Sequence, residues 1–333
     1  MSRLSVRRSL HDHVQPLESR RLLAFTPFVD EAVVPGAKPA SYDLDVAGDG
    51  SYIVAYADGT TLRAVRYDAK GRQVGGEITV ASFVTARVDD VSVAMDADGD
   101  AVIAYSSLEP GTNFGDFRYA HINRSGVVDD TGQLDGWQRD RAADVAVSMD
   151  PGGGFFIGSI GYGIGGTYQL RFRAFDSNGV LRGGSFVAFQ QNLPDSAADD
   201  LDVAAKHDGS GAVFAYALVE DGGDVKRVNY GRVSTSALVG SIGKIEGAEV
   251  GAPSVAIRAD GSFAIAYQQQ LSDPPSVPSG PWMDGRIRRF DAAGAQVGNT
   301  ISLVNAYSVM LKFAKLWEIQ HATPNSQIPA PKT

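Results

Sequence analysis

The chain of 333 residues contains no cysteine and only five histidines. The absence of cysteine excludes disulfides, thiolate zinc sites, iron–sulfur clusters and a cysteine nucleophile. The histidines show no spacing typical of nucleophilic catalysis, and His121 is predicted to be an ordinary strand residue. No apolar run reaches the roughly 18 residues that a membrane-spanning helix needs, so no transmembrane segment is predicted.

Basic side chains are outnumbered by acidic ones. Lys and Arg total 30 against 39 Asp and Glu, which gives a formal net charge of -9. Such a surface repels nucleic acid and anionic lipid, and it favours cations, polyols or basic partners. No nucleic-acid partner is therefore predicted. The apolar fraction of 44% and the 38 glycines indicate a folded chain that is rich in turns.

Internal repetition is the most informative feature that the chain does have. A segment of about 50 residues recurs five times, and the second copy shows its start clearly over residues 91–105. Each copy contains an apolar strand, a turn that is usually Asp-Gly, a second strand, a variable loop, an Arg-rich third strand and a turn that closes on Gly. A repeat of this length cannot bury its own apolar faces, so the copies are expected to pack on one another.

Alternating apolar and polar residues predict β-strands in every repeat. A short fourth strand is recognisable in three copies, at residues 77–80, 185–188 and 300–304. Four antiparallel strands per copy predict an all-β fold, a β-propeller of five four-stranded blades. A β-sandwich pair or a solenoid built from the same hairpins is the alternative. Tyr56, Tyr105, Tyr216 and Tyr267, which recur near the end of the second strand, are expected to pack between blades.

The two ends of the chain depart from the repeat. Residues 1–24 are predicted to be a basic, disordered leader, residues 25–305 the propeller domain, and residues 306–333 an amphipathic helix followed by a disordered tail. Residues 25–34 read as an additional strand, so one strand is surplus or a sixth blade is missing. The short C-terminal helix is predicted either to cap the array or to be a truncated or non-native end.

Residues 17–24 read LESRRLLA and follow several arginines. This octapeptide resembles the LExRRLLA motif found near the N-terminus of many predicted surface and exported proteins of planctomycete-type bacteria. The resemblance implies an exported bacterial protein that is extracellular or at the cell surface. A basic leader without a sorting role is the alternative.

The repeats, with stretches such as SVAMDADGDAVIAY and RRFDAAGAQVG, resemble the tandem propeller-like repeats of large bacterial extracellular and hemolysin-type calcium-associated proteins. The resemblance covers residues 41–305. Those proteins commonly carry Trp where this chain has Tyr at the end of the second strand, and their arrays are longer. The resemblance implies an adhesive or structural surface module and not an enzyme.

One turn is a candidate metal site. Asp96, Asp98 and Asp100 surround a Gly bend, and calcium accepts about six to eight oxygen ligands in irregular loops of this kind. The equivalent turns of the other copies lose most of these carboxylates, and all but the third keep Asp-Gly. A tight hairpin turn that binds no metal is the alternative.

Three further carboxylates are candidate ligand-binding residues. Asp90, Asp144 and Asp200 occupy the same position at the start of the first strand in three copies. In a propeller this position lies at the mouth of the central channel, where polar ligands bind. The alternative is that each carboxylate accepts hydrogen bonds from loose backbone donors at the start of its blade. Asp129 and Asp130 are predicted to lie in a loop, and no spacing selects them as a catalytic pair.

The sequence therefore predicts an exported surface or extracellular propeller module for binding, adhesion or scaffolding. Calcium is its candidate ligand, and its partner is an unidentified protein or polysaccharide surface. A propeller-fold polysaccharide hydrolase or lyase that uses carboxylates at the channel mouth is the alternative. The sequence selects no catalytic residue and favours a function that is not enzymatic.

Overall fold

The computed structural model describes residues 41–111, 114–138, 144–163, 167–191, 197–220, 225–247, 250–271 and 282–302. All regular structure in these residues is β-strand. The predicted leader at 1–24, the additional strand at 25–34 and the C-terminal helix within 306–333 lie outside the described residues.

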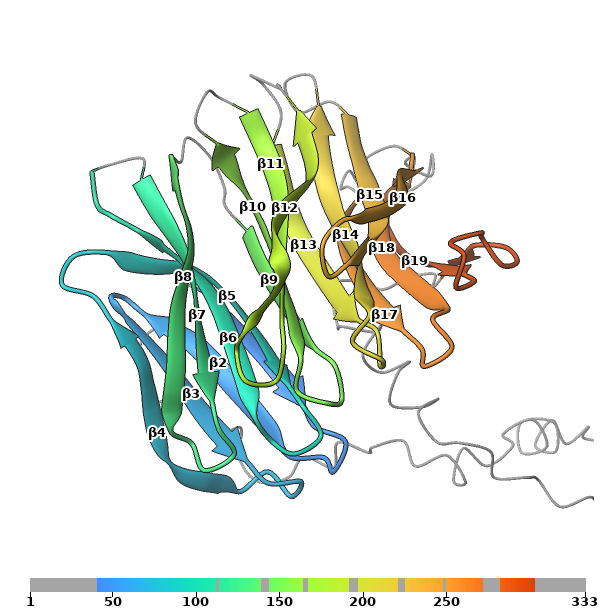
Figure 1. The fold of residues 1–333 in the computed structure, drawn as a ribbon. Coiled ribbons are helices and arrows are strands. Elements are labelled where there is room, and N and C mark those ends of the chain that lie inside the picture. The colour runs from blue at the N-terminus through green and yellow to red at the C-terminus, as the bar shows by residue number, and fades with distance from the viewer. Residues whose placement is uncertain are drawn as a thin grey trace, which may run out of the picture. The chain divides into compact units, whose positions relative to one another are not determined.

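Each repeat forms one antiparallel sheet of four strands, whose order in the sheet is their order in the chain (Figure 1). Sheet 1 contains β1 (Tyr42–Val46), β2 (Tyr52–Asp58), β3 (Thr61–Tyr67) and β4 (Gln73–Ser82). Sheet 2 contains β5 (Arg87–Met95), β6 (Ala101–Leu108), β7 (Phe114–Ile122) and β8 (Val128–Gln138). Sheet 3 contains β9 (Asp144–Met149), β10 (Phe155–Gly163), β11 (Thr167–Phe175) and β12 (Leu181–Gln191). Sheet 4 contains β13 (Ala197–Ala205), β14 (Gly211–Glu220), β15 (Val225–Ser234) and β16 (Leu238–Ile245). Sheet 5 contains β17 (Val250–Ile257), β18 (Phe263–Leu271), β19 (Trp282–Phe290) and β20 (Ile301–Ser302).

These sheets confirm the predicted fold class of five four-stranded blades. The fourth strands β8 and β16, which were predicted to exist but were not assigned residues, complete sheets 2 and 4. Both strands are rich in Gly and polar residues, and β16 is largely exposed on both faces. A last strand with little apolar surface to bury carries only a weak alternating pattern, which is why it escaped notice.

The turns between strands follow the predicted chemistry. In the third turn of sheet 1, the Asp68 carboxylate accepts hydrogen bonds from the backbone N–H groups of Lys70 and Arg72, each at 2.9 Å. Gly71 then adopts a left-handed conformation with φ of 75°. The same arrangement recurs at Asp176 and Gly179 in sheet 3. Asp therefore opens these turns and Gly closes them, as their sequence spacing predicted.

Consecutive sheets pack face to face through four apolar clusters. We call the face of a sheet that packs on the next sheet in chain order its forward face, and the opposite one its reverse face. Small side chains such as Ala55 and Ala64 on the forward face of sheet 1 meet Val91, Val93 and Tyr105 on the reverse face of sheet 2. Corresponding clusters join sheets 2 and 3, sheets 3 and 4, and sheets 4 and 5.

The recurring tyrosines lie within this packing. Tyr105, Tyr216 and Tyr267 are buried on reverse faces, each in the cluster shared with the preceding sheet. The predicted packing between blades is therefore confirmed for these three. Tyr56 is also buried, and its hydroxyl donates a hydrogen bond to Glu77 within sheet 1. In sheet 3 the equivalent residue is Ser159.

Candidate functional site

Polar side chains on the first strands of the sheets point forward and bind the backbone of the next sheet. In sheet 1, the Asp43 Oδ2 atom accepts a hydrogen bond from the N–H of Val93 in sheet 2 at 2.9 Å. Its Oδ1 atom accepts another from the N–H of Leu44 in its own strand at 2.8 Å. Asp202 in sheet 4 repeats this pair of bonds with Val255 in sheet 5 and with its own neighbour Val203.

Serine performs the same task at other positions. The Ser92 Oγ atom accepts from the N–H of Val147 at 3.2 Å, and the Ser148 Oγ atom accepts from the N–H of Ala205 at 3.0 Å. In every case the acceptor binds the backbone N–H of the residue that follows its own equivalent in the next sheet. Asp43, for example, is equivalent to Ser92 and binds the N–H of Val93. We call this set the acceptor residues. It consists of Asp43, Asp45, Asp90, Ser92, Asp144, Ser148 and Asp202.

Two of the three predicted ligand-binding residues belong to this set. The Asp90 Oδ2 atom accepts from the N–H of Val145 at 3.0 Å, and the Asp144 Oδ2 atom accepts from the N–H of Leu201. The Asp90 Oδ1 atom also accepts from the hydroxyl of Ser41, at 3.4 Å. The alternative interpretation, in which these carboxylates bind backbone donors, agrees with this geometry. The Asp144 Oδ1 atom also accepts from the N–H of Val145 in its own blade at 3.0 Å, whereas the Val145 donor of Asp90 and the Leu201 donor of Asp144 lie on the next sheet.

The structure also brings these carboxylates close to one another. Burial of its carboxyl group raises the pKa of Asp144 well above the usual range for Asp, and the charge of Asp90, its hydrogen bond with Asp90 and the charge of Asp200 raise it further. The bond from Leu201 opposes this shift. Asp200 itself is exposed and has a left-handed φ of 53°, which is uncommon for Asp. The Asp144 carboxyl group thus retains its proton more strongly than an isolated carboxyl group does.

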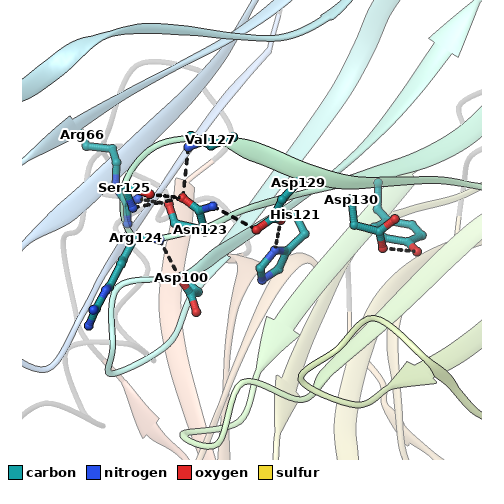
Figure 2. Close-up of polar contacts among 10 residues, drawn as sticks. Arg66, Asp100, His121, Asn123, Arg124, Ser125, Val127, Asp129 and Asp130 are labelled. Carbon is teal, nitrogen blue, oxygen red and sulfur yellow. Dashed lines mark hydrogen bonds and ion pairs between the residues drawn. The ribbon is translucent and has the colours of Figure 1, made fainter.

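The carboxylates of the predicted calcium loop accept hydrogen bonds from backbone N–H groups of their own turn and of a neighbouring turn. Asp96 is buried, and its Oδ1 atom accepts from the N–H groups of Asp98 and Asp100 at 2.9 Å. Desolvation raises the pKa of Asp96. The Asp100 Oδ1 atom accepts from the N–H of Arg124 at 2.6 Å (Figure 2). This geometry favours the hairpin-turn alternative.

A basic side chain from the preceding sheet reaches the same turn. The Arg66 guanidinium donates to the carbonyl oxygen of Gly99 and, at 2.5 Å, to that of Asn123. Burial lowers the pKa of Arg66, while the charges of Asp100 and Asp96 raise it. Other sheets have similar contacts, in which Arg182 donates to the carbonyl of Gly209 and Arg232 to that of Ala292. A protein cation therefore lies where the sequence suggested a metal ion. Within the ranges that the structure describes, no group of three His, Asp or Glu side chains is arranged to hold a metal.

The second sheet has a polar cluster at the position that Arg66 and Arg232 occupy in their sheets (Figure 2). His121 on β7 lies with its Nδ1 atom 2.5 Å from the Asp129 Oδ1 atom, and the Asn123 amide donates to the Asp129 Oδ2 atom at 3.0 Å. Desolvation raises the pKa of Asp129, but the bonds from His121 and Asn123 outweigh it, so the net shift is downward. The prediction of a strand position for His121 is confirmed, whereas Asp129 and Asp130 lie on β8 and not in a loop.

The replacement of Tyr by Ser159 in sheet 3 leaves a crevice between sheets 2 and 3. It has an empty volume of about 170 Å³ and does not admit a water-sized sphere. Its lining residues are Leu134, Ile157, Ser159, Arg171, Phe172 and Arg173. The crevice is therefore a packing defect of the repeat and is too narrow to hold a ligand in this conformation.

Comparisons with known proteins bear on the fold. No protein-family model and no curated protein sequence matches this chain. A Hadza microbial sialidase matches with a TM-score of 0.50 and 11% identity, over 79% of this chain and 58% of the sialidase. A protein of unknown function from Dyadobacter fermentans DSM 18053 matches with a TM-score of 0.48 and 12% identity, over 79% and 82% of the two chains.

A mutant of the Synechocystis apocarotenoid oxygenase matches with a TM-score of 0.45 and 11% identity, over 80% of this chain and 62% of the oxygenase. The chain thus spans less than two thirds of the oxygenase and sialidase chains. At such low identity, the likeness to the sialidase concerns the fold alone. The chain is a β-propeller module. No helix in the described ranges is long and apolar enough to cross a membrane.

Proposed function

We propose that this chain is an exported bacterial propeller module that binds a protein or polysaccharide partner at the cell surface and does not act as an enzyme. The proposal rests on the hydrogen bonds that the aligned carboxylates accept. Asp90 and Asp144 each accept a backbone N–H of the next sheet. Their role in joining the sheets explains their alignment without a substrate. The export motif at residues 17–24 supplies the proposed location.

One observation favours a second candidate, a polysaccharide hydrolase or lyase. A general acid that works near neutral pH needs a raised pKa, and burial beside Asp90 raises the pKa of Asp144. Asp144 would be the proton donor of such an enzyme, and Asp90 lies beside it. The hydrogen bond from the Leu201 N–H holds the Asp144 Oδ2 atom against the protein backbone, which is why we prefer the binding module.

The two candidates are separated by assaying the full chain against a panel of bacterial and algal polysaccharides. We expect retention of the protein on at least one immobilised polysaccharide or on intact cell-wall material, without release of new reducing ends. Asp144→Asn should leave retention unchanged. Asp208→Asn, in an exposed turn of sheet 4, is the matched control. Release of reducing ends that is lost in Asp144→Asn and kept in Asp208→Asn would establish the enzyme instead.

Calcium and export are proposed as separate parts of this function. If the turn at Asp96, Asp98 and Asp100 binds calcium, titration at millimolar calcium releases or absorbs heat that Asp98→Ala removes. An absence of such heat excludes calcium from this turn. If residues 17–24 direct export, their replacement by a polar sequence of equal length in a planctomycete host shifts the protein from the surface fraction to the cytoplasm. Unchanged fractionation would exclude that role for the motif.

A further inference from the structure

The first strand of sheet 1 exposes a surface that all four other sheets bury. Leu44 is 43% exposed, whereas Val93, Val147, Val203 and Val255 at the same register are exposed by 5% or less. Tyr42 is 67% exposed, whereas Val91, Val145 and Leu201 are buried. These side chains belong to the reverse face, which in sheets 2 to 5 is covered by the forward face of the preceding sheet. Around β1, this face of sheet 1 therefore exposes side chains at positions that the other sheets use for packing on a preceding sheet.

Sheet 5 carries the matching half of the same interface. Ser254 occupies the register of the acceptor residues Asp43, Ser92 and Asp202 and is only partly buried. Its hydroxyl donates to the Asp202 Oδ2 atom of sheet 4 at 2.9 Å, and its Oγ atom can still accept a hydrogen bond. Arg289 occupies the register of Arg66 and Arg232, and it is exposed. In those two sheets this Arg donates to carbonyl oxygens in a turn of the next sheet.

The internal interfaces indicate what a sheet needs in order to cover Leu44. All four use a Ser or Asp acceptor on the first strand, and those after sheets 1, 3 and 4 also use an Arg on the third or fourth strand. The forward face of sheet 5 has Ser254 and Arg289, together with small side chains at Ala264 and Ala266 like those of sheet 1. Sheet 5 thus carries the groups that cover a first strand elsewhere in the fold.

We propose that the chain associates with a second copy of itself head to tail, with the reverse face of sheet 1 around Tyr42 and Leu44 packed on the forward face of sheet 5 around Ser254 and Arg289. Because the two surfaces differ, the contact is heterologous. Association by such a contact continues beyond a dimer unless the geometry closes a ring. By analogy with the internal interfaces, the Leu44 N–H is expected to donate to Ser254 as well as to Asp43, as the Val145 N–H donates to both Asp90 and Asp144. The carbonyl oxygens in the turns of sheet 1 are the expected partners of Arg289.

Sedimentation velocity of the full chain over a range of concentrations tests the association. We expect the mean sedimentation coefficient to rise with concentration up to about 100 μM, the range of weak specific complexes. Leu44→Asp should weaken the association at least about 10-fold, because it places a carboxylate in an apolar interface. Val84→Asp, at a position that is 98% exposed, is the matched control and should leave it unchanged. Arg289→Glu tests the opposite surface independently if Leu44→Asp impairs folding, which circular dichroism would reveal.

Crosslinking tests the head-to-tail geometry, and it is simple because the chain has no cysteine. Leu44→Cys and Ser254→Cys variants are mixed and treated with a short bismaleimide. The mixture should give crosslinked dimers in much higher yield than either variant alone. A chain that stays monomeric at all concentrations would overturn the proposal. Equal crosslinking of Leu44→Cys with itself would also overturn it, since that result indicates a symmetric contact.

Discussion

Asp202 offers the most direct measurement of what an acceptor residue contributes to stability. Its Oδ2 atom accepts the N–H of Val255 at 2.8 Å and the hydroxyl of Ser254 at 2.9 Å, and its Oδ1 atom accepts the N–H of Val203 at 2.9 Å. A hydrogen bond to a charged group contributes about 1.5–3 kcal/mol. Three bonds that share one partly buried carboxylate are not additive, so we expect Asp202→Ala to lower the free energy of unfolding by about 3 kcal/mol.

Urea titrations followed by circular dichroism measure this loss. Asp208→Ala is the matched control, because its exposed carboxylate accepts the N–H of Ser210 within one turn and its removal should cost only about 0.5 kcal/mol. Because stability in a repeat protein depends on contacts between neighbours, the loss should be local. Hydrogen exchange should accelerate in sheet 5 and remain unchanged in sheet 1. If Asp202→Ala and Asp208→Ala cost the same and exchange in sheet 5 does not change, the acceptor residues do not join the sheets energetically.

Three further predictions follow from named contacts. The raised pKa of Asp144 means that its contribution to stability is present below about pH 3.9, the value for an unfolded Asp, and is lost as the pH rises through the raised value. The urea midpoint of Asp144→Asn minus that of the native chain should therefore increase as the pH rises from about 4 to about 8. A difference that stays constant over this range would contradict the prediction. Gly243→Ala would place a Cβ atom 2.3 Å from the Tyr230 ring and should cost about 1–3 kcal/mol by the same titration, whereas Gly76→Ala, with open space around it, should be nearly neutral. Arg66→Ala should cost about 1–3 kcal/mol, because two carbonyl oxygens lose a partly buried charged donor, and a cost as small as that of Gly76→Ala would contradict this.

The parts of the fold that depend on local sequence could be predicted. Turn chemistry is local: Asp68 and Gly71 act within one turn, and their spacing is visible in a single copy of the repeat. The apolar pattern of the first three strands is local in the same sense, because it can be read from consecutive residues of a single strand. A fourth strand was predicted in every copy, but the residues of β8 and β16 could not be located, since outer strands bury little apolar surface and so carry little pattern.

The acceptor residues could not be predicted in the same way, although their sequence signal was present. Asp43 and its partner Val93 are 50 residues apart, and the hydrogen bond between them exists only once two sheets have packed. The available signal was a polar residue at every second position of a strand expected to be apolar on both faces, as at Asp43 and Asp45. That alternation predicts a polar forward face, but it does not reveal that another sheet covers it. The same limit applied to Asp90 and Asp144, whose alignment was visible and whose backbone partners were not.

Once the acceptor residues are assigned to folding, the departures from the repeat become the informative positions. At their register, Arg66 and Arg232 donate to a turn of the next sheet, whereas sheet 3 has Ala174 at this position. Sheet 2 has His121 there instead, and its imidazole binds Asp129 in its own sheet. Folding explains an Arg at this position, but it does not explain a histidine paired with an exposed carboxylate. A polar pair that folding does not explain is a candidate functional position, because departures from local rules are expected at functional sites. A ligand-binding surface on this module is therefore to be sought first on the outer strands of sheet 2, around His121 and Asp129, and only then among the aligned carboxylates.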